Sequence, residues 1–237
     1  MTEKNWYDHI YVYDNLIQDD NIIAVGDLAY VPGWQYGKIS NPKYKDLSFN
    51  KEEKYNKKTY GVAHLDQHWT LSLNGNQMLS WETEELGVYD LWKTIRKHLD
   101  EQFKGMTLDI ADCYVTGYTH GMTSLPSVAP NSVWTILYYV NPLWEIEWGG
   151  QTVFYKGTDN TGTKLKDEEP DVIKSIYPKP GRFVFFNGAI PYAETPPNNL
   201  FPGLKTTLKF DCFSAEAVTN LARAYDPGRP DDEPIQQ

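Results

Sequence analysis

The sequence predicts a mainly β protein of the α+β type, with an antiparallel sandwich or jelly roll at its core. Between residues 107 and 213, short β-rich segments follow one another, separated by turn formers and without intervening helices. Short strands joined in this way favour antiparallel sheets over a parallel α/β sheet. Two helical segments precede these strands, and we expect them to support the core.

The predicted core strands are 108–118, 133–140, 151–155, 172–177, 182–187 and 206–213. Pro180-Gly181 suits a tight turn that starts the 182–187 strand. Gly149-Gly150 precedes the 151–155 strand, where the missing side chains permit unusual backbone angles or the close approach of another group. Both dipeptides are therefore interpreted as structural.

The segment before the core begins with a β-rich stretch at 9–13 and a stretch of mixed polarity at 14–30, which predicts a short helix. Residues 31–58 lack periodicity and are predicted to form a loop or irregular structure. The strongest helix signal is at 84–103. Apolar residues recur there at spacings of three and four, at Val88, Leu91, Trp92, Ile95, Leu99 and Phe103. Gly105 is expected to end this helix.

The length of 237 residues suits one structural domain with a substantial core. We expect residues 1–106 to form an N-terminal strand, loops and a supporting helix packed on the core. Residues 107–213 would be the core, and 214–237, rich in Pro and Asp, a loose C-terminal tail. The polar segment 156–169 lies between two predicted strands and resembles a hairpin loop or lid.

The formal charge of −10 argues against a broad nucleic-acid-binding surface, since such surfaces rely on Lys and Arg. No apolar run approaches the roughly 18 residues that a membrane span needs. The first residues contain no apolar segment after a basic start, so we expect a cytoplasmic protein. Cys113 and Cys212 lie in strand-like stretches and are predicted to be core residues rather than a disulfide. A small substrate or a protein partner fits this composition best.

Three strings, in order, carry a resemblance to a known family: SVWTILYYVNP at 132–142, WGGQTVFY at 148–155 and PKPGRFVFFNG at 178–188. Together they resemble the core of prolyl-4-hydroxylase-like 2-oxoglutarate/Fe(II) dioxygenases, a family also common among phages of marine bacteria. The likeness covers residues 111–210. It implies a double-stranded β-helix, that is, a cupin-like jelly roll, and a location in the host cell cytoplasm if the chain is phage-encoded.

In that family, a His-x-Asp pair and a distal His hold Fe(II). Counting from the approach Gly117-Tyr118-Thr119-His120-Gly121 places the His-x-Asp positions at Ser127 and Ala129. The distal His follows an Ile-Pro pair, and Ile190-Pro191 is followed here by Tyr192. The resemblance therefore implies that all three metal positions are replaced.

These replacements are poor iron ligands. A serine hydroxyl binds weakly unless it is ionised, alanine has no donor atom, and a free tyrosine has a pKa of about 10. We therefore predict no catalytic residues and no metal at Ser127, Ala129 and Tyr192. Fe(II) would be a cofactor only if other residues bound it.

A literal His-x-Asp string occurs elsewhere, at His64-Leu65-Asp66, with His68 nearby and His120 further along. It precedes the 84–103 helix and was placed outside the core strands, and motifs this short arise by chance. The interpretation that competes with a metal site is that His64 and His68 are surface or second-layer residues. An active oxygenase with non-standard ligands would draw on this set and on Glu194.

The family binds the distal carboxylate of 2-oxoglutarate with a basic residue about thirteen positions after the distal His, and Lys205 has that offset from Tyr192. A Lys pairs with a carboxylate as a point charge. Tyr114 and Thr207 lie where the family places hydroxyl donors. The resemblance therefore keeps 2-oxoglutarate as a candidate cofactor.

Two functions remain open. The first is a catalytically inactive member of the family that binds a protein or peptide through the former substrate groove, with aromatic residues such as Trp134, Tyr138, Trp144 and Trp148 as lining. A phage structural or accessory protein is a variant of this function. The second is a working prolyl-4-hydroxylase-like oxygenase with non-standard metal ligands. Neither predicts binding to nucleic acid or to a membrane.

Overall fold

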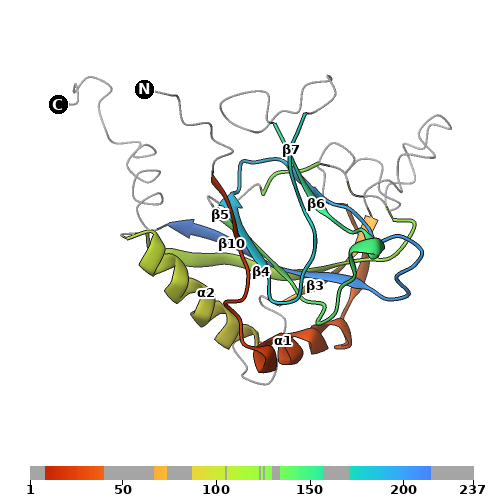
Figure 1. The fold of residues 1–237 in the computed structure, drawn as a ribbon, viewed down its shortest axis with the longest axis horizontal. Coiled ribbons are helices and arrows are strands. Elements are labelled where there is room, and N and C mark those ends of the chain that lie inside the picture. The colour runs from red at the N-terminus through yellow and green to blue at the C-terminus, as the bar shows by residue number, and fades with distance from the viewer. Residues whose placement is uncertain are drawn as a thin grey trace, which may run out of the picture.

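The computed structural model describes residues 9–39, 67–73, 87–104, 106–122, 124, 126–129, 134–156 and 171–214. Two antiparallel sheets face each other and form a jelly roll, the double-stranded β-helix, as Figure 1 shows. The predicted mainly β class is confirmed. The predicted tail beyond residue 214, most of the segment 156–169 and the string His64-Leu65-Asp66 lie outside the described residues.

The larger sheet has seven strands in the order β1-β8-β5-β10-β4-β3-β2. Its strands are β1 (Ile10–Tyr13), β8 (Phe183–Asn187), β5 (Trp134–Tyr139), β10 (Lys205–Ser214), β4 (Leu108–Tyr118), β3 (Gln67–Ser72) and β2 (Gln35–Ile39). The longest strands, β4 and β10, pair along their whole length near the middle of this sheet. They provide the floor of the candidate site.

The smaller sheet has three strands in the order β7-β6-β9. These are β7 (Val172–Ile176), β6 (Thr152–Tyr155) and β9 (Tyr192–Glu194). β6 and β7 pair as a hairpin, as predicted for the strands flanking the 156–169 segment. β9 is the edge strand that borders the interior and carries Tyr192 and Glu194.

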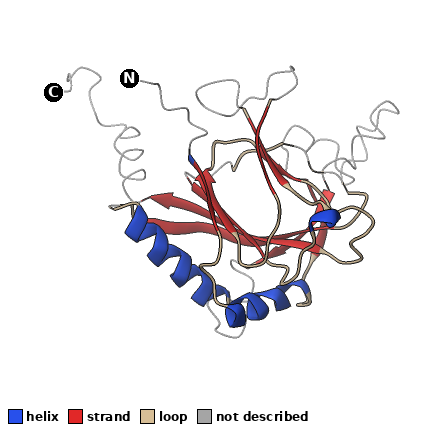
Figure 2. Ribbon diagram, viewed as in Figure 1, coloured by secondary structure: helices blue, strands red, loops and turns tan. Residues whose placement is uncertain are grey.

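The helices cover the outer face of the larger sheet (Figure 2). α2 (Val88–Gln102) buries the predicted apolar face against the sheet, with Trp92 packed on Phe210 at 5.3 Å between ring centroids. α1 (Asp19–Gly26) continues into a short 3-10 turn, η2 (Asp27–Ala29). α2 ends at Gln102, and Gly105, predicted to end the helix, lies outside the described residues. Both predicted helices are confirmed.

Side chains of β8 point alternately to the two faces of the larger sheet and so contribute to two separate hydrophobic clusters. Phe183 and Phe185 face the helices, whereas Val184 and Phe186 face the smaller sheet. Successive side chains of a strand point to opposite faces, so one strand can serve both clusters. Cys113 and Cys212 are free, buried thiols on the helix side, as predicted.

β10 alternates in the same way, but only one of its faces is apolar. Leu208, Phe210 and Cys212 join the cluster under the helices. The intervening residues are polar and buried, namely Lys205, Thr207, Lys209 and Asp211. The interior of the jelly roll is therefore partly apolar and partly polar.

Three strands were not predicted. β2 lies in the segment 31–58, which was predicted to be a loop, and its residues Gln35 and Tyr36 are exposed. Exposed residues such as these leave no alternating pattern of burial in the sequence. β3 carries His68 and pairs with β4 in the larger sheet, and the string His64-Leu65-Asp66 precedes the described part of this strand. β9 has three residues, too few to establish a period.

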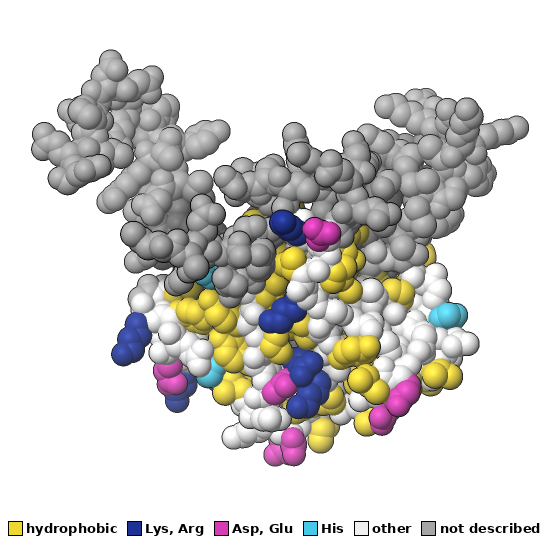
Figure 3. Space-filling view, turned by 45° about the horizontal axis from the view of Figure 1, so that its top comes forward, with side chains coloured by type: hydrophobic (Ala, Val, Ile, Leu, Met, Phe, Trp, Pro, Cys, Tyr) yellow, Lys and Arg dark blue, Asp and Glu magenta, His cyan; other side chains and the backbone are white. Residues whose placement is uncertain are grey.

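None of the helices among the described residues is long and apolar enough to cross a membrane. Figure 3 shows one face of the molecule, on which basic and acidic side chains are interspersed rather than separated by sign. Among the described residues visible there, no continuous basic stripe is formed of the kind that tracks phosphates.

Candidate functional site

The structure places two of the predicted metal positions side by side. The Ser127 amide donates to the Tyr192 carbonyl at 3.0 Å, and the Tyr192 amide donates to the Ser127 carbonyl at 2.9 Å. The Ala129 amide donates to the Gly188 carbonyl at 3.0 Å. The segment carrying Ser127 and Ala129 therefore runs along the chain that leads into β9.

The Tyr192 side chain is buried in the interior. Its ring packs on Phe186 at 5.1 Å and lies 6.1 Å from Phe154, and its hydroxyl accepts a hydrogen bond from Lys209 Nζ at 3.3 Å. Burial raises the pKa of Tyr192 to about 12, and the positive charge of Lys209 opposes this only in part. The phenol is therefore neutral at pH 7.

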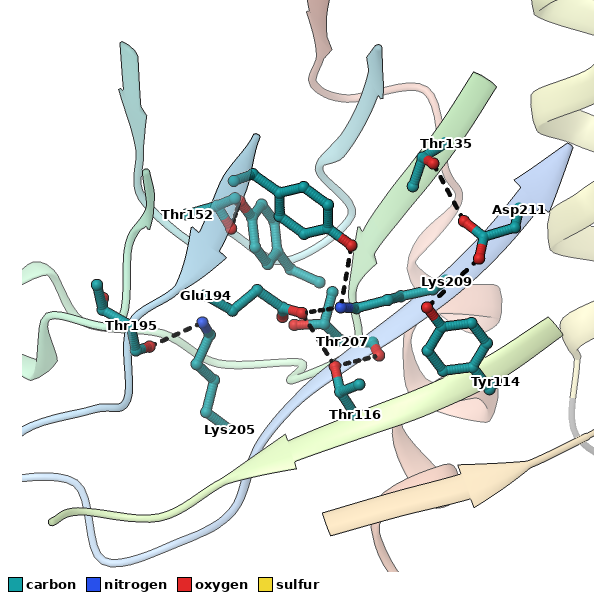
Figure 4. Close-up of polar contacts among 12 residues, drawn as sticks. Tyr114, Thr116, Thr135, Thr152, Glu194, Thr195, Lys205, Thr207, Lys209 and Asp211 are labelled. Atoms are coloured by element: carbon teal, nitrogen blue, oxygen red, sulfur yellow. Dashed lines mark hydrogen bonds and ion pairs between the residues drawn. The ribbon is translucent and has the colours of Figure 1, made fainter. Parts of the chain in front are cut away.

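Lys209 also forms a buried ion pair with Glu194, which comes from the smaller sheet (Figure 4). Thr116 of β4 donates to Glu194 Oε1 at 3.1 Å. Burial disfavours the Glu194 carboxylate, but Lys209 first, and then Lys205, lower its pKa to about 2. Burial likewise disfavours the Lys209 ammonium, and Glu194 raises its pKa well above the usual value. Both groups are therefore charged at neutral pH.

Thr207 also helps to lower the pKa of Glu194. However, the Thr207 hydroxyl and Glu194 Oε2 are not within hydrogen-bond geometry of any partner among the described residues. The direct contacts of the Glu194 carboxylate are those with Lys209 and Thr116. Thr207 is paired with Thr116 on β4 and with Tyr139 on β5, so all three side chains face the interior.

Lys205 has a different environment from Lys209, although both lie on the same face of β10. Its Nζ donates to the Thr195 carbonyl at 3.0 Å and lies 5.6 Å from the centre of the Tyr118 ring. Burial lowers the pKa of Lys205 to about 8, and the attraction of Glu194 opposes this only in part. Lys205 is thus a buried cation without a carboxylate in direct contact among the described residues.

The close approach of Lys205 and Trp144 to Gly150 explains why a glycine stands at this position. Gly150 has φ +76°, and a Cβ there would lie 2.9 Å from Trp144 Cζ2 and 3.2 Å from Lys205 Cδ. A side chain would therefore clash with the tryptophan and crowd the lysine. The close approach predicted at Gly149-Gly150 is confirmed at Gly150.

Tyr114 and Asp211 extend the polar network toward the far end of β10. Thr135 donates to Asp211 Oδ1 at 3.1 Å, and the Tyr114 hydroxyl donates to Asp211 Oδ2 at 3.4 Å (Figure 4). Among the predicted 2-oxoglutarate-binding residues, Tyr114 thus contacts a protein carboxylate. Lys205 contacts a backbone carbonyl instead.

The alternative metal ligands do not form a cluster among the described residues. His68 is buried on β3 with its ring 5.3 Å from Tyr118, which rules out a surface position, and His120 is exposed beyond the end of β4. Glu194 is paired with Lys209. Within the part of the chain that the structure describes, no three His, Cys, Asp or Glu side chains gather as a metal site. His64 and Asp66 lie outside it.

Sequence reasoning missed Lys209, Thr116 and Asp211, and considered Glu194 only as a metal ligand. The sequence does contain a signal for a polar face of β10. Polar residues alternate with apolar ones along this predicted strand, at Lys205, Thr207, Lys209 and Asp211. Strictly alternating polarity usually indicates a solvated face. Here the polar face lies inside, because the smaller sheet covers it.

No protein-family model and no curated protein matches the sequence. Solved structures do match. A prolyl hydroxylase from Trichoplax adhaerens, in complex with a hypoxia inducible factor peptide fragment, is 15% identical, with a TM-score of 0.58 over 90% of this chain and 86% of that one. A 2OG-Fe(II) oxygenase family protein from Burkholderia pseudomallei is 8% identical, with a TM-score of 0.55 over 89% of this chain and 92% of that one.

A viral collagen prolyl hydroxylase from Paramecium Bursaria Chlorella virus-1, solved with 2OG, is 15% identical with a TM-score of 0.50. The match covers 86% of this chain and 95% of that one. At such low identity, the similarity establishes the architecture and no more. The chain therefore has the double-stranded β-helix fold of prolyl hydroxylases and 2OG-Fe(II) oxygenases.

Proposed function

We propose that this chain is a catalytically inactive module on the 2-oxoglutarate/Fe(II) dioxygenase fold, which acts by binding or scaffolding a protein or peptide. The proposal rests on the protonation and hydrogen bonding of Tyr192, which occupies the position assigned to the distal iron ligand. Its phenol is buried, neutral at pH 7 and hydrogen-bonded to Lys209, whose ammonium is paired with Glu194. The interior position assigned to the distal iron ligand is thus part of a protein-only network.

The residues present do not fit Fe(II). Ser127 offers a neutral hydroxyl, Ala129 offers no donor, and the Tyr192 phenol would have to lose a proton at a pKa of about 12. In addition, the Lys209 ammonium lies 3.3 Å from the Tyr192 oxygen and would repel a divalent cation there. Both the donor set and the local charge oppose a metal at these three positions.

The residues also fit 2-oxoglutarate poorly. Lys205, the proposed anchor, donates to the Thr195 carbonyl, and Tyr114 donates to Asp211. A dianionic ligand near Lys205 would also meet the ionised Glu194, whose negative charge acts on Lys205 and raises the pKa of that lysine. We therefore propose that the module works without a cofactor.

A partner would bind on the surface rather than in the interior. Trp134 and Tyr138, predicted to line a groove, pack on the helix side instead, with Trp134 stacked on Phe185 at 4.7 Å. Trp144 and Trp148 remain candidates. They contact Phe201 at 4.7 and 4.8 Å between ring centroids, and exposed apolar residues lie nearby in the chain, at Leu143, Ile146 and Leu200.

The assignment of Ser127, Ala129 and Tyr192 as the former metal positions can be tested by introducing the missing metal ligands there. We expect the wild-type protein, incubated with Mn(II) under anaerobic conditions and desalted, to retain no stoichiometric metal by elemental analysis. The triple variant Ser127→His, Ala129→Asp and Tyr192→His is expected to retain about one ion per chain, since it restores a two-histidine, one-carboxylate set and the added carboxylate offsets the charge of Lys209. The single variant Ser127→His serves as the control and should retain none.

Stoichiometric metal in the wild-type protein would contradict the proposal. If that metal is lost on changing His64 and Asp66 to Ala, the active oxygenase with non-standard ligands becomes the better explanation. A triple variant that folds, as judged by circular dichroism, but takes up no metal would show that Ser127, Ala129 and Tyr192 are not the metal positions.

A further inference from the structure

The Glu194 carboxylate lies in a receptor built by the larger sheet. Lys209 of β10 pairs with it, and Thr116 of β4 donates to its Oε1 at 3.1 Å. Lys205 and Thr207, on the same face of β10, also favour its ionised form. The carboxylate is 1% exposed, and one cation and one hydroxyl contact it directly.

The carboxylate itself comes from the other sheet. Glu194 is the last residue of β9, a strand of three residues paired with β6. The two groups that contact it, Lys209 and Thr116, come from β10 and β4. The donor groups therefore belong to the larger sheet, and the carboxylate that they bind belongs to the smaller sheet.

We propose that the interior face of β4 and β10 is a carboxylate-binding site, and that Glu194 occupies it as a ligand built into the chain. This site recognises a single carboxylate through Lys209 and Thr116. In the intact chain it is filled, so free carboxylates are excluded. The inference goes beyond the proposed function, because it holds whether or not the module binds a partner.

The size of the site follows from the side chain that fills it. Changing Glu194 to Ala keeps Cβ and removes one methylene and the carboxylate, which together have the shape of acetate. The vacated space is lined by Lys209 and Thr116, and Thr207 is the residue paired with Thr116 on the neighbouring strand. Charge-assisted hydrogen bonds favour an anion there over water, and the methylene space favours acetate over chloride. The chemical class of ligand is therefore a short monocarboxylate.

The experiment measures the thermal midpoint of Glu194→Ala in rising sodium acetate, with sodium chloride at matched ionic strength. We expect a saturable rise with acetate, on the order of 5–10 °C at about 100 times Kd. The wild-type protein should show no saturable rise, because Glu194 fills the site. Glu194→Gln should show none either, because its amide occupies the same volume.

The variant Glu194→Ala with Lys209→Met is the second control and should lose the response to acetate. Butyrate should act more weakly than acetate in Glu194→Ala, because its longer chain exceeds the vacated space. If Glu194→Ala does not fold in chloride, its refolding yield against acetate concentration replaces the thermal midpoint. Equal responses of Glu194→Ala and Glu194→Gln, or a response that survives Lys209→Met, would overturn the inference.

These outcomes are separate from those of the metal experiment. Uptake of metal by the wild-type protein would contradict the inactive module but leave the predicted acetate response unchanged. A missing acetate response would contradict the internal ligand but leave the metal result unchanged.

Discussion

Replacing Lys209 with Met is expected to destabilise the protein by about 3–5 kcal/mol, the range for breaking a buried ion pair on one side. The Glu194 carboxylate would remain buried with its charge and lose its direct partner. Tyr192 would lose its hydrogen-bond donor at the same time. Urea denaturation at pH 7 measures the effect.

The double variant Lys209→Met with Glu194→Met should recover most of the lost stability. Well-packed apolar residues of similar volume commonly replace a buried ion pair at little cost. If Lys209→Met alone changes the free energy of unfolding by less than about 1 kcal/mol, the ion pair is exposed to water and its description as a buried network is wrong.

Lys205→Met is the matched control on the same strand, and its effect should have the opposite sign. Burial lowers the folded-state pKa of Lys205 from 10.5 to about 8. Below about pH 8 the folded state carries the full cost of burying this charge, so the Met variant should be more stable at pH 7, on the order of 1–3 kcal/mol. In the wild type, stability should rise between about pH 8 and pH 10.5, where the unfolded state binds more protons.

Acidification should remove the stability that the Glu194 carboxylate provides. Its pKa is about 2 in the folded state against an ordinary value of 4.5, so the folded state binds fewer protons between these values. The stabilisation is therefore complete above about pH 4.5 and is lost as the pH falls toward 2. The shift corresponds to a loss on the order of 3 kcal/mol. Urea denaturation at pH 6, 4 and 3 measures this slope.

Glu194→Gln provides the control for the acid prediction, because its amide does not titrate. Asp14 also has a lowered pKa, through its hydrogen bonds to Arg182, and remains in both proteins. Its contribution cancels in the comparison. The difference in stability between wild type and Glu194→Gln should therefore shrink as the pH falls below about 4.5. A constant difference down to pH 3 would show that Glu194 is not held ionised.

Most of the regular structure could be predicted from local patterns. β4 begins and ends at the predicted residues. β6, β7 and β8 differ from their predictions by one residue at one end, and β5 and β10 differ by one residue at both ends. α2 begins at Val88, after Gly87, whose φ of +65° suits a residue without Cβ. α2 buries one face and so displays a helical period, whereas β5 and β8 are buried on both faces and stand out as short β-rich runs between turn formers.

The interior of the site could not be predicted in the same way. Ser127 and Tyr192 were assigned by resemblance, and the backbone pairing between them agrees with their common location. The partnership of Lys209 with Glu194 depends on how two sheets face each other across the interior, which no local pattern encodes. Sequence also could not show that Tyr192 would be a neutral phenol bonded to a lysine.

We hold that the buried charged groups of the interior are paired with protein groups, Glu194 with Lys209 and Lys205 with the Thr195 carbonyl. Calorimetric titration of the wild-type protein with 2-oxoglutarate in the presence of Mn(II) tests this claim most directly. We expect no saturable heat, because Glu194 already pairs with Lys209 and Lys205 already binds the Thr195 carbonyl. Binding of one 2-oxoglutarate per chain that Lys205→Met abolishes would contradict the account.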